Sequence, residues 1–183
     1  MKRLICSVTV LLVLTYFAVS CEKDDICAEG SPTTPSLIVE FYNKDNGEEL
    51  VNLINFRYYA VGETDTLPDV EEGTTTSFSK IELPLRTDAT TTKWGLIFTR
   101  RLSNGQFTEP NTDFLEFNYE TNPAYVSRAC GFATTFMLSP NLNGAPNPVH
   151  TDSEDADGLW IDDVEVITTN IEDESETHIK IFL

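Results

Sequence analysis

The chain has 183 residues and a formal net charge of −18 at pH 7, from 30 Asp and Glu against 12 Lys and Arg. This length is enough for one domain with a buried core. Such negative charge repels phosphate groups, which argues against nucleic acid as a partner and against direct docking of the body onto anionic lipid headgroups.

The first 20 residues are typical of a secretory signal peptide. Lys2 and Arg3 form a positive start, and residues 4–19 are almost wholly apolar but short for a membrane span. Small residues at Ala18 and Ser20 precede Cys21, and this arrangement resembles a bacterial lipoprotein signal. We therefore expect residues 1–20 to be removed and Cys21 to carry lipid. An ordinary cleaved signal with an incidental cysteine is the competing interpretation.

Acidic residues with one lysine follow the expected lipidation site, as Lys23, Asp24 and Asp25. These residues resemble the short signal that sends lipoproteins of Bacteroidota to the outer face of the outer membrane. The prediction is a lipid-anchored, cell-surface protein, with attachment facing the periplasm as the alternative.

Four cysteines are present, and two of them remain available for pairing in the mature protein. Cys6 leaves with the leader and Cys21 would be acylated, so Cys27 and Cys130 have only each other as partners in an oxidising compartment. We predict a disulfide between them, with two buried free thiols as the alternative. There is no Cys-x-x-Cys pair, and only two histidines occur, so no metal centre built on cysteine and histidine is expected, and no cofactor.

The mature chain is expected to comprise a lipidated tether, residues 21–36, and one β domain, residues 37–183. Hydrophobic alternation and β-forming residues indicate strands, and no amphipathic helix longer than two turns is evident. The expected strands are near residues 37–42, 50–61, 81–85, 94–98, 115–119, 125–138, 160–168 and 177–183. About eight short strands predict an all-β fold, a single β-sandwich of immunoglobulin-like or transthyretin-like type. Residues 139–158 are expected to form a long loop, and residues 172–174 to turn the final hairpin.

The expected strand at residues 125–138 carries the main conflict in the pattern. Its alternation places Cys130, Phe132 and Phe136 on the side facing the core. Arg128 has the same parity, so we expect either a bulge near Gly131 or a guanidinium paired with a carboxylate.

The acidic segment 153–158 is the candidate calcium site, with Asp155 and Asp157 as ligands. Read as an EF-hand loop, however, the segment has Val164 where the bidentate glutamate belongs, and strands are expected around it. A solvated acidic loop is the competing interpretation.

Two tryptophans, Trp160 and Trp94, are the candidate platforms for stacking on sugar rings, although aromatics at strand spacing more often belong to a core. Asp65-Thr66-Leu67 resembles a bacterial O-glycosylation acceptor, which makes Thr66 a candidate modification site. Catalysis is not expected. His150 falls in the expected loop, alternation directs His178 toward solvent, and no nucleophile motif lies near either.

Two longer motifs carry a family resemblance that covers most of the mature chain. The start Cys21-Glu22-Lys23-Asp24-Asp25-Ile26-Cys27 and the later segment Tyr125-Val126-Ser127-Arg128-Ala129-Cys130-Gly131-Phe132 are similar to a family of uncharacterised Bacteroidota lipoproteins. The resemblance implies a lipid on Cys21, structural roles for Cys27 and Cys130, and an outer-membrane β-barrel as a candidate partner. The functional expectation is a non-enzymatic binding or envelope-assembly module. A surface module that binds polysaccharide is the alternative, followed by a glycoside hydrolase.

Overall fold

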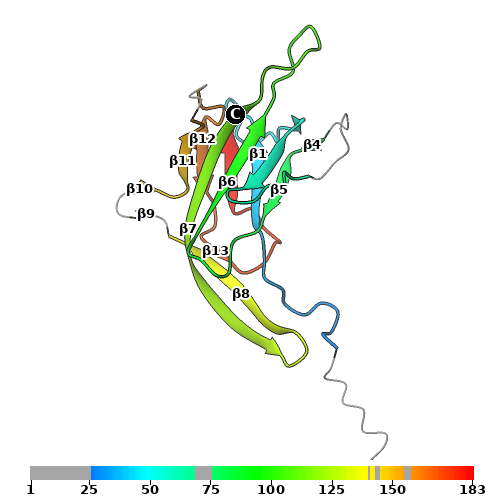
Figure 1. Cartoon of the computed structure of the whole chain (residues 1–183), viewed down its shortest axis with the longest axis vertical. Helices are drawn as coiled ribbons and strands as arrows, with labels where there is room; N and C mark the ends of the chain where they lie inside the picture. The colour runs from blue at the N-terminus through cyan, green and yellow to red at the C-terminus, as the bar shows by residue number, and fades with distance from the viewer. Residues whose placement is uncertain (1–25, 69–75, 140, 143–144, 155–157) are drawn as a thin grey trace, which may run out of the picture. The chain divides into compact units, whose positions relative to one another are not determined.

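The computed structural model describes residues 26–68, 76–139, 141–142, 145–154 and 158–183 (Figure 1). The chain forms two compact units. The smaller unit comprises the N-terminal residues up to Pro32 together with residues 125–133, and the larger unit comprises residues 33–124 and 134–183. Each unit is described by itself.

One sheet of the larger unit has the strand order β12-β14-β1-β5. Its strands are β1 (Leu37–Tyr42), β5 (Lys80–Leu83), β12 (Asp163–Val166) and β14 (Ile179–Phe182). The first strand runs parallel to the last, with Val39 opposite Ile179, and the other two pairs are antiparallel. The alternation predicted for β1 is confirmed, because Leu37, Val39 and Phe41 are fully buried.

The second sheet has the order β13-β8-β7-β6-β3, and β11 also pairs with β7. Its strands are β3 (Arg57–Ala60), β6 (Thr91–Phe98), β7 (Asn111–Ser127), β8 (Gly131–Leu138), β11 (Val149–Asp152) and β13 (Asn170–Ile171). Two short pairs complete the described strands: β2 (Leu53–Ile54) with β4 (Ser77–Phe78), and β9 (Asn141–Leu142) with β10 (Ala145–Pro146). The predicted all-β sandwich is confirmed.

Side chains from both sheets form one hydrophobic core in the larger unit. Phe41 from β1 and Phe56 from the segment before β3 meet edge to face, with their ring centroids 5.2 Å apart. Each fully buried Phe, Leu or Ile contributes about 1.5–3 kcal/mol relative to an exposed one, so this core is the main source of stability.

The expected single strand over residues 125–138 is wrong. β7 continues past Pro123 to Ser127, and a turn then leads into β8 at Gly131, where φ is +74°. Arg128 is exposed in this turn and makes no ion pair with any described residue. Phe132 is also exposed, at 69 % of its surface, because alternation predicts which residues share a face but not how far along that face the covering layer extends.

Two other expectations near the C-terminus need correction. Residues 139–158 are not one loop, since β11 within them pairs with β7. The predicted strand at 160–168 is shorter, beginning at Asp163, although its antiparallel pairing with β14 is confirmed. The connection between β12 and β14 is wider than a tight hairpin, because β13 lies within it and pairs with β8 in the second sheet.

His178 is buried, at 1 % exposure, rather than directed to solvent. Its Nδ1 accepts a hydrogen bond from the backbone N–H of Ile38 at 2.9 Å, and the backbone N–H of His178 donates to the Ile38 carbonyl at 3.0 Å. Burial lowers the pKa of His178 and outweighs the opposing influence of Glu176 and Asp173. A neutral imidazole therefore joins the start of β1 to the start of β14.

Candidate functional site

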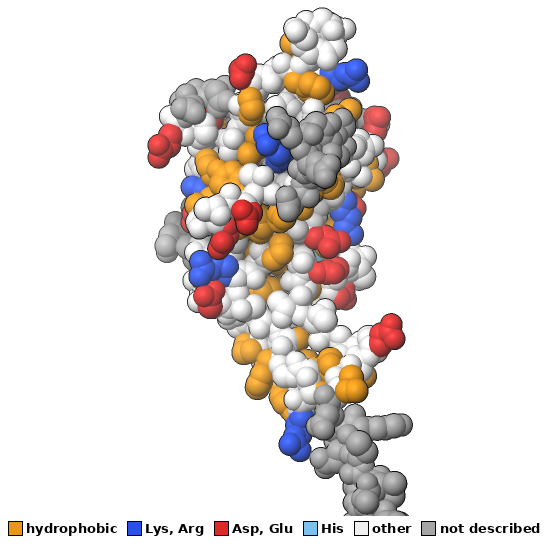
Figure 2. Space-filling model, turned by 45° about the vertical axis from the view of Figure 1, so that its right-hand side comes forward, with side chains coloured by type: hydrophobic (Ala, Val, Ile, Leu, Met, Phe, Trp, Pro, Cys, Tyr) orange, Lys and Arg blue, Asp and Glu red, His pale blue; other side chains and the backbone are white. Residues whose placement is uncertain are grey.

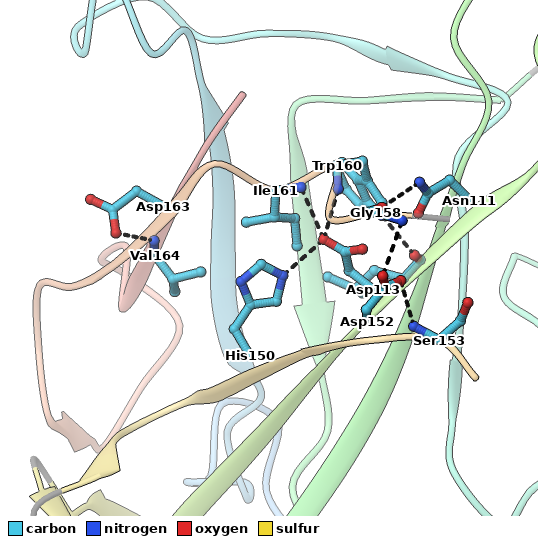
Figure 3. A network of polar contacts seen from close by, with 11 residues as sticks. Asn111, Asp113, His150, Asp152, Ser153, Gly158, Trp160, Ile161, Asp163 and Val164 are labelled. Carbon is cyan, nitrogen blue, oxygen red and sulfur yellow. Dashed lines mark hydrogen bonds and ion pairs between the residues drawn. The ribbon is translucent and has the colours of Figure 1, made fainter. Parts of the chain in front are cut away.

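A buried carboxylate on β7 organises the candidate site. Asp113 is completely buried, and its Oδ2 accepts hydrogen bonds from Nε2 of His150 at 2.8 Å and from the backbone N–H groups of Trp160 and Ile161 at 3.1 and 2.9 Å (Figure 3). Strand alternation explains the burial, because Asp113 has the same parity as Leu115 and faces the core.

Hydrogen bonds around Asp113 hold the segment that precedes β12. Asn111 Nδ2 donates to the Gly158 carbonyl at 2.6 Å, and the Gly158 N–H donates to Asp152 Oδ2 at 3.0 Å. Burying a carboxylate is costly unless it is hydrogen-bonded, and three donors converge on Oδ2 here, whereas the buried Oδ1 has no hydrogen-bond partner among the described residues. The Asp113 network thus fixes the position of the Trp160 backbone.

The Trp160 side chain lies beside a surface cavity of about 250 Å³. Its indole Nε1 donates to the Leu96 carbonyl at 3.1 Å, and its ring packs against Phe98 with centroids 5.1 Å apart. The cavity is lined by Val51, Asn52, Leu53, Ile54, Phe98, Thr99, Arg100, Arg101, Trp160, Asp162 and Leu183. All of these residues belong to the larger unit.

Polar groups of this cavity come mainly from the end of β6. Thr99 Oγ1 is buried without a hydrogen-bond partner among the described residues. Arg100 and Arg101 follow it and are exposed, and neither makes an ion pair within the described part of the chain. Asp162 is paired with Lys44 at 2.8 Å, and this contact raises the pKa of Lys44. The lining therefore combines an apolar wall with two available guanidinium groups.

Of the two candidate stacking tryptophans, only Trp160 borders this cavity. Trp94 is 4 % exposed and contacts Tyr58 within the core, with ring centroids 5.8 Å apart. A ring buried in this way presents no face to a sugar, so the interpretation of Trp94 as a platform is wrong. Aromatic residues at strand spacing belong here to the core.

The disulfide between Cys27 and Cys130 is present and closes a sequence separation of 103 residues. Thr66 is half-buried in the segment after β3, where the next residue, Leu67, exchanges backbone hydrogen bonds with Tyr58. The other predicted site residues lie outside the described part of the chain: Cys21, Lys23, Asp24, Asp25, Asp155 and Asp157.

Among the described residues, no group of three or more His, Cys, Asp and Glu side chains is placed to hold a metal ion. Within the same residues we find no helix whose length and hydropathy would carry it across a bilayer.

Sequence reasoning missed the two features that build the site. An acid at Asp113 on the core-facing parity of a strand was a signal of a buried, partnered carboxylate. The adjacent Arg100 and Arg101 were a second signal, since they form a local pair of cations in a very acidic chain.

A family model matches most of the chain. The family of unknown function DUF6452 matches residues 55–183. The chain belongs to this family. The DUF6452 match includes Asp113, the end of β6 and Trp160, whereas Cys21 and Cys27 precede it. No curated protein matches the chain, and no solved structure does.

Proposed function

We propose that this protein is an exported lipoprotein of the Bacteroidota type, anchored to the outer membrane through Cys21 and acting as a binding module rather than an enzyme. The leader and the residues Lys23, Asp24 and Asp25 support this localisation. The disulfide supports export as well, because disulfides persist in oxidising compartments. The acidic residues after Cys21 support display on the cell surface, with attachment facing the periplasm as the alternative.

The ligand that fits the cavity best is an acidic saccharide. The observation that carries this proposal is the cavity wall formed by Trp160 and Phe98, with Arg100 and Arg101 beside it. An aromatic wall offers an apolar face to a sugar ring, and guanidinium groups bind carboxylates with paired hydrogen bonds.

The small number of acidic residues in the cavity favours binding over hydrolysis. Glycoside hydrolases generally use two carboxylates that flank the scissile bond. Within the described lining, Asp162 is the single Asp or Glu, and it is held by Lys44. The proposal is therefore a non-catalytic module.

The ligand proposal is tested by titrating the protein with uronic acid-containing oligosaccharides and with neutral ones of equal length, using tryptophan fluorescence and calorimetry. We expect saturable binding of the acidic series, weakened at least tenfold by Arg100→Gln with Arg101→Gln. Arg57→Gln is the matched control, because Arg57 is also an exposed arginine but does not line the cavity. Equal binding by the double variant and the control would contradict the proposal. Recovery of a β-barrel protein from native membranes, without saccharide binding, would favour envelope assembly instead.

The lipid anchor is tested separately by metabolic labelling with a palmitate analogue. We expect label on the natural protein and none on Cys21→Ala. Protease treatment of intact cells then distinguishes surface display from attachment facing the periplasm.

A further inference from the structure

The smaller unit carries large hydrophobic side chains on its surface. Tyr125 and Phe132, at the two sides of the β7–β8 turn, are 60 % and 69 % exposed, and their rings meet edge to face with centroids 5.5 Å apart. Ile26, beside the disulfide, is 82 % exposed. We call Tyr125, Phe132, Arg128 and Ile26 the aromatic tip. Figure 2 shows exposed hydrophobic side chains over this end of the hairpin. An exposed hydrophobic cluster of this kind indicates a surface that contacts another protein or a membrane.

The backbone of the tip is held by local constraints. Gly131 adopts a φ of +74°, which an L side chain rarely allows, and the Cys130 N–H donates to the Ser127 hydroxyl at 3.0 Å. The disulfide joins Cys130 to Cys27, with their Cα atoms 4.8 Å apart. The exposed rings are therefore presented on a cross-linked turn.

The length of chain before the disulfide limits how far the tip can lie from the expected lipid. Cys27 is six residues after Cys21, and a fully extended chain spans at most about 3.6 Å per residue, so these Cα atoms are at most about 22 Å apart. A lipid on Cys21 sits in the bilayer with its glyceryl group at the headgroups. Cys27 must then lie within about 22 Å of the headgroup layer, and the disulfide keeps Cys130 beside it.

Charge also favours the smaller unit as the part that meets the membrane. Its described residues contain one acid, Glu29, and one base, Arg128, whereas all but four of the 30 acids of the chain lie in residues 33–124 and 134–183. Anionic headgroups repel the larger unit but not the tip. Arg128 can pair with a phosphate while its alkyl stem lies along apolar neighbours.

We propose that the aromatic tip inserts into the interfacial layer of the membrane that holds the lipid on Cys21, so that the protein has a second, side-chain contact with the bilayer. Tyrosine suits this depth, because its ring is apolar and its hydroxyl remains hydrated. The inference rests on the proposed lipid anchor and adds to it the orientation of the smaller unit at the surface.

The test uses the full chain, expressed with its own leader and purified with its lipid. The protein is placed in vesicles of phosphatidylethanolamine and phosphatidylglycerol whose acyl chains carry bromine near the headgroup end, because bromine quenches nearby tryptophan. Phe132→Trp and, as a second reporter, Tyr125→Trp add a fluorophore at the tip. Leu159→Trp is the matched control, since Leu159 is an exposed hydrophobic residue of the larger unit.

We expect brominated lipid to quench both tip variants at least twofold more than the control, whose extra tryptophan should behave as if in water. Quenching of the tip variants equal to that of Leu159→Trp overturns the inference. The mass of the N-terminal peptide from the same samples separates the two proposals. Lipid on Cys21 without quenching at the tip rejects the membrane contact alone, and absence of lipid rejects the anchor on which it rests.

Discussion

Replacement of Asp113 by alanine is expected to destabilise the larger unit strongly. The change leaves three donors without their acceptor: the backbone N–H groups of Trp160 and Ile161 and Nε2 of His150. A buried donor left unsatisfied costs about 1–3 kcal/mol, and His150 retains some access to water. We therefore expect a loss of about 3–5 kcal/mol in the free energy of unfolding, summed over the three donors.

The assay is urea denaturation followed by tryptophan fluorescence, with thermal unfolding as a second measure. For a protein of this size, 1 kcal/mol shifts the melting temperature by about 2–4 °C, so Asp113→Ala should melt roughly 6–20 °C lower. His150→Ala removes only one of the three hydrogen bonds, so its loss should be nearer 1 kcal/mol. Because Trp160 borders the cavity, Asp113→Ala should also increase quenching of Trp160 by acrylamide.

Asp88→Ala is the matched control, since Asp88 is an exposed acid whose pKa is lowered by its contact with Arg86. It should leave stability nearly unchanged, as exposed ion pairs contribute little. If Asp113→Ala is as stable as Asp88→Ala, the carboxylate does not hold the Trp160 segment, and the account of the site is wrong.

Three further predictions concern other parts of the chain. Burial lowers the pKa of His178, so its contribution to stability is present above about pH 6.5 and is lost as the pH falls through the lower folded-state pKa. In thermal unfolding, His178→Asn, which keeps an acceptor for the Ile38 N–H, should therefore lose less stability than the natural protein between pH 8 and pH 5, and equal losses would refute the role of the imidazole. Replacing Cys27 and Cys130 by serine should cost up to about 4–5 kcal/mol in urea denaturation, because the closed loop spans about 100 residues, and a stability insensitive to both the substitutions and reductant would contradict this. Gly95→Ala would place Cβ 2.5 Å from the Tyr59 ring, so we expect a loss of about 1–3 kcal/mol that disappears in a Tyr59→Ser background, whereas an equal loss in both backgrounds would rule out the ring contact.

Strand alternation predicted the sandwich well wherever one face of a strand is covered. Leu115, Phe117 and Tyr119 share a parity, and all three are buried on β7. The end of this strand was not predictable in the same way, because proline lacks a donor and usually marks a strand terminus. β6 pairs with β7 only as far as Asn118, so β7 has no β6 neighbour on that side at Pro123. The strand therefore accommodates a residue that has no N–H to donate.

The site was less predictable than the fold because it depends on contacts between distant segments. Asp113 meets His150 and Trp160 across sequence separations of 37 and 47 residues, and no local pattern encodes such a meeting. His178 was misplaced for a similar reason. It is buried and accepts a hydrogen bond from the backbone N–H of Ile38, 140 residues away, and the alternation of its own strand does not predict this contact. The disulfide could be predicted because the expected loss of Cys6 with the leader and acylation of Cys21 left one pairing, whatever the fold.

The intact mass of the protein extracted from membranes of the cells that make it tests the central claim most directly. We predict a chain that begins at Cys21, carries a diacylglyceryl group, and is lighter by two hydrogens than its reduced form. A mass for the chain with its leader retained, or for an unmodified chain with two free thiols, would contradict the account.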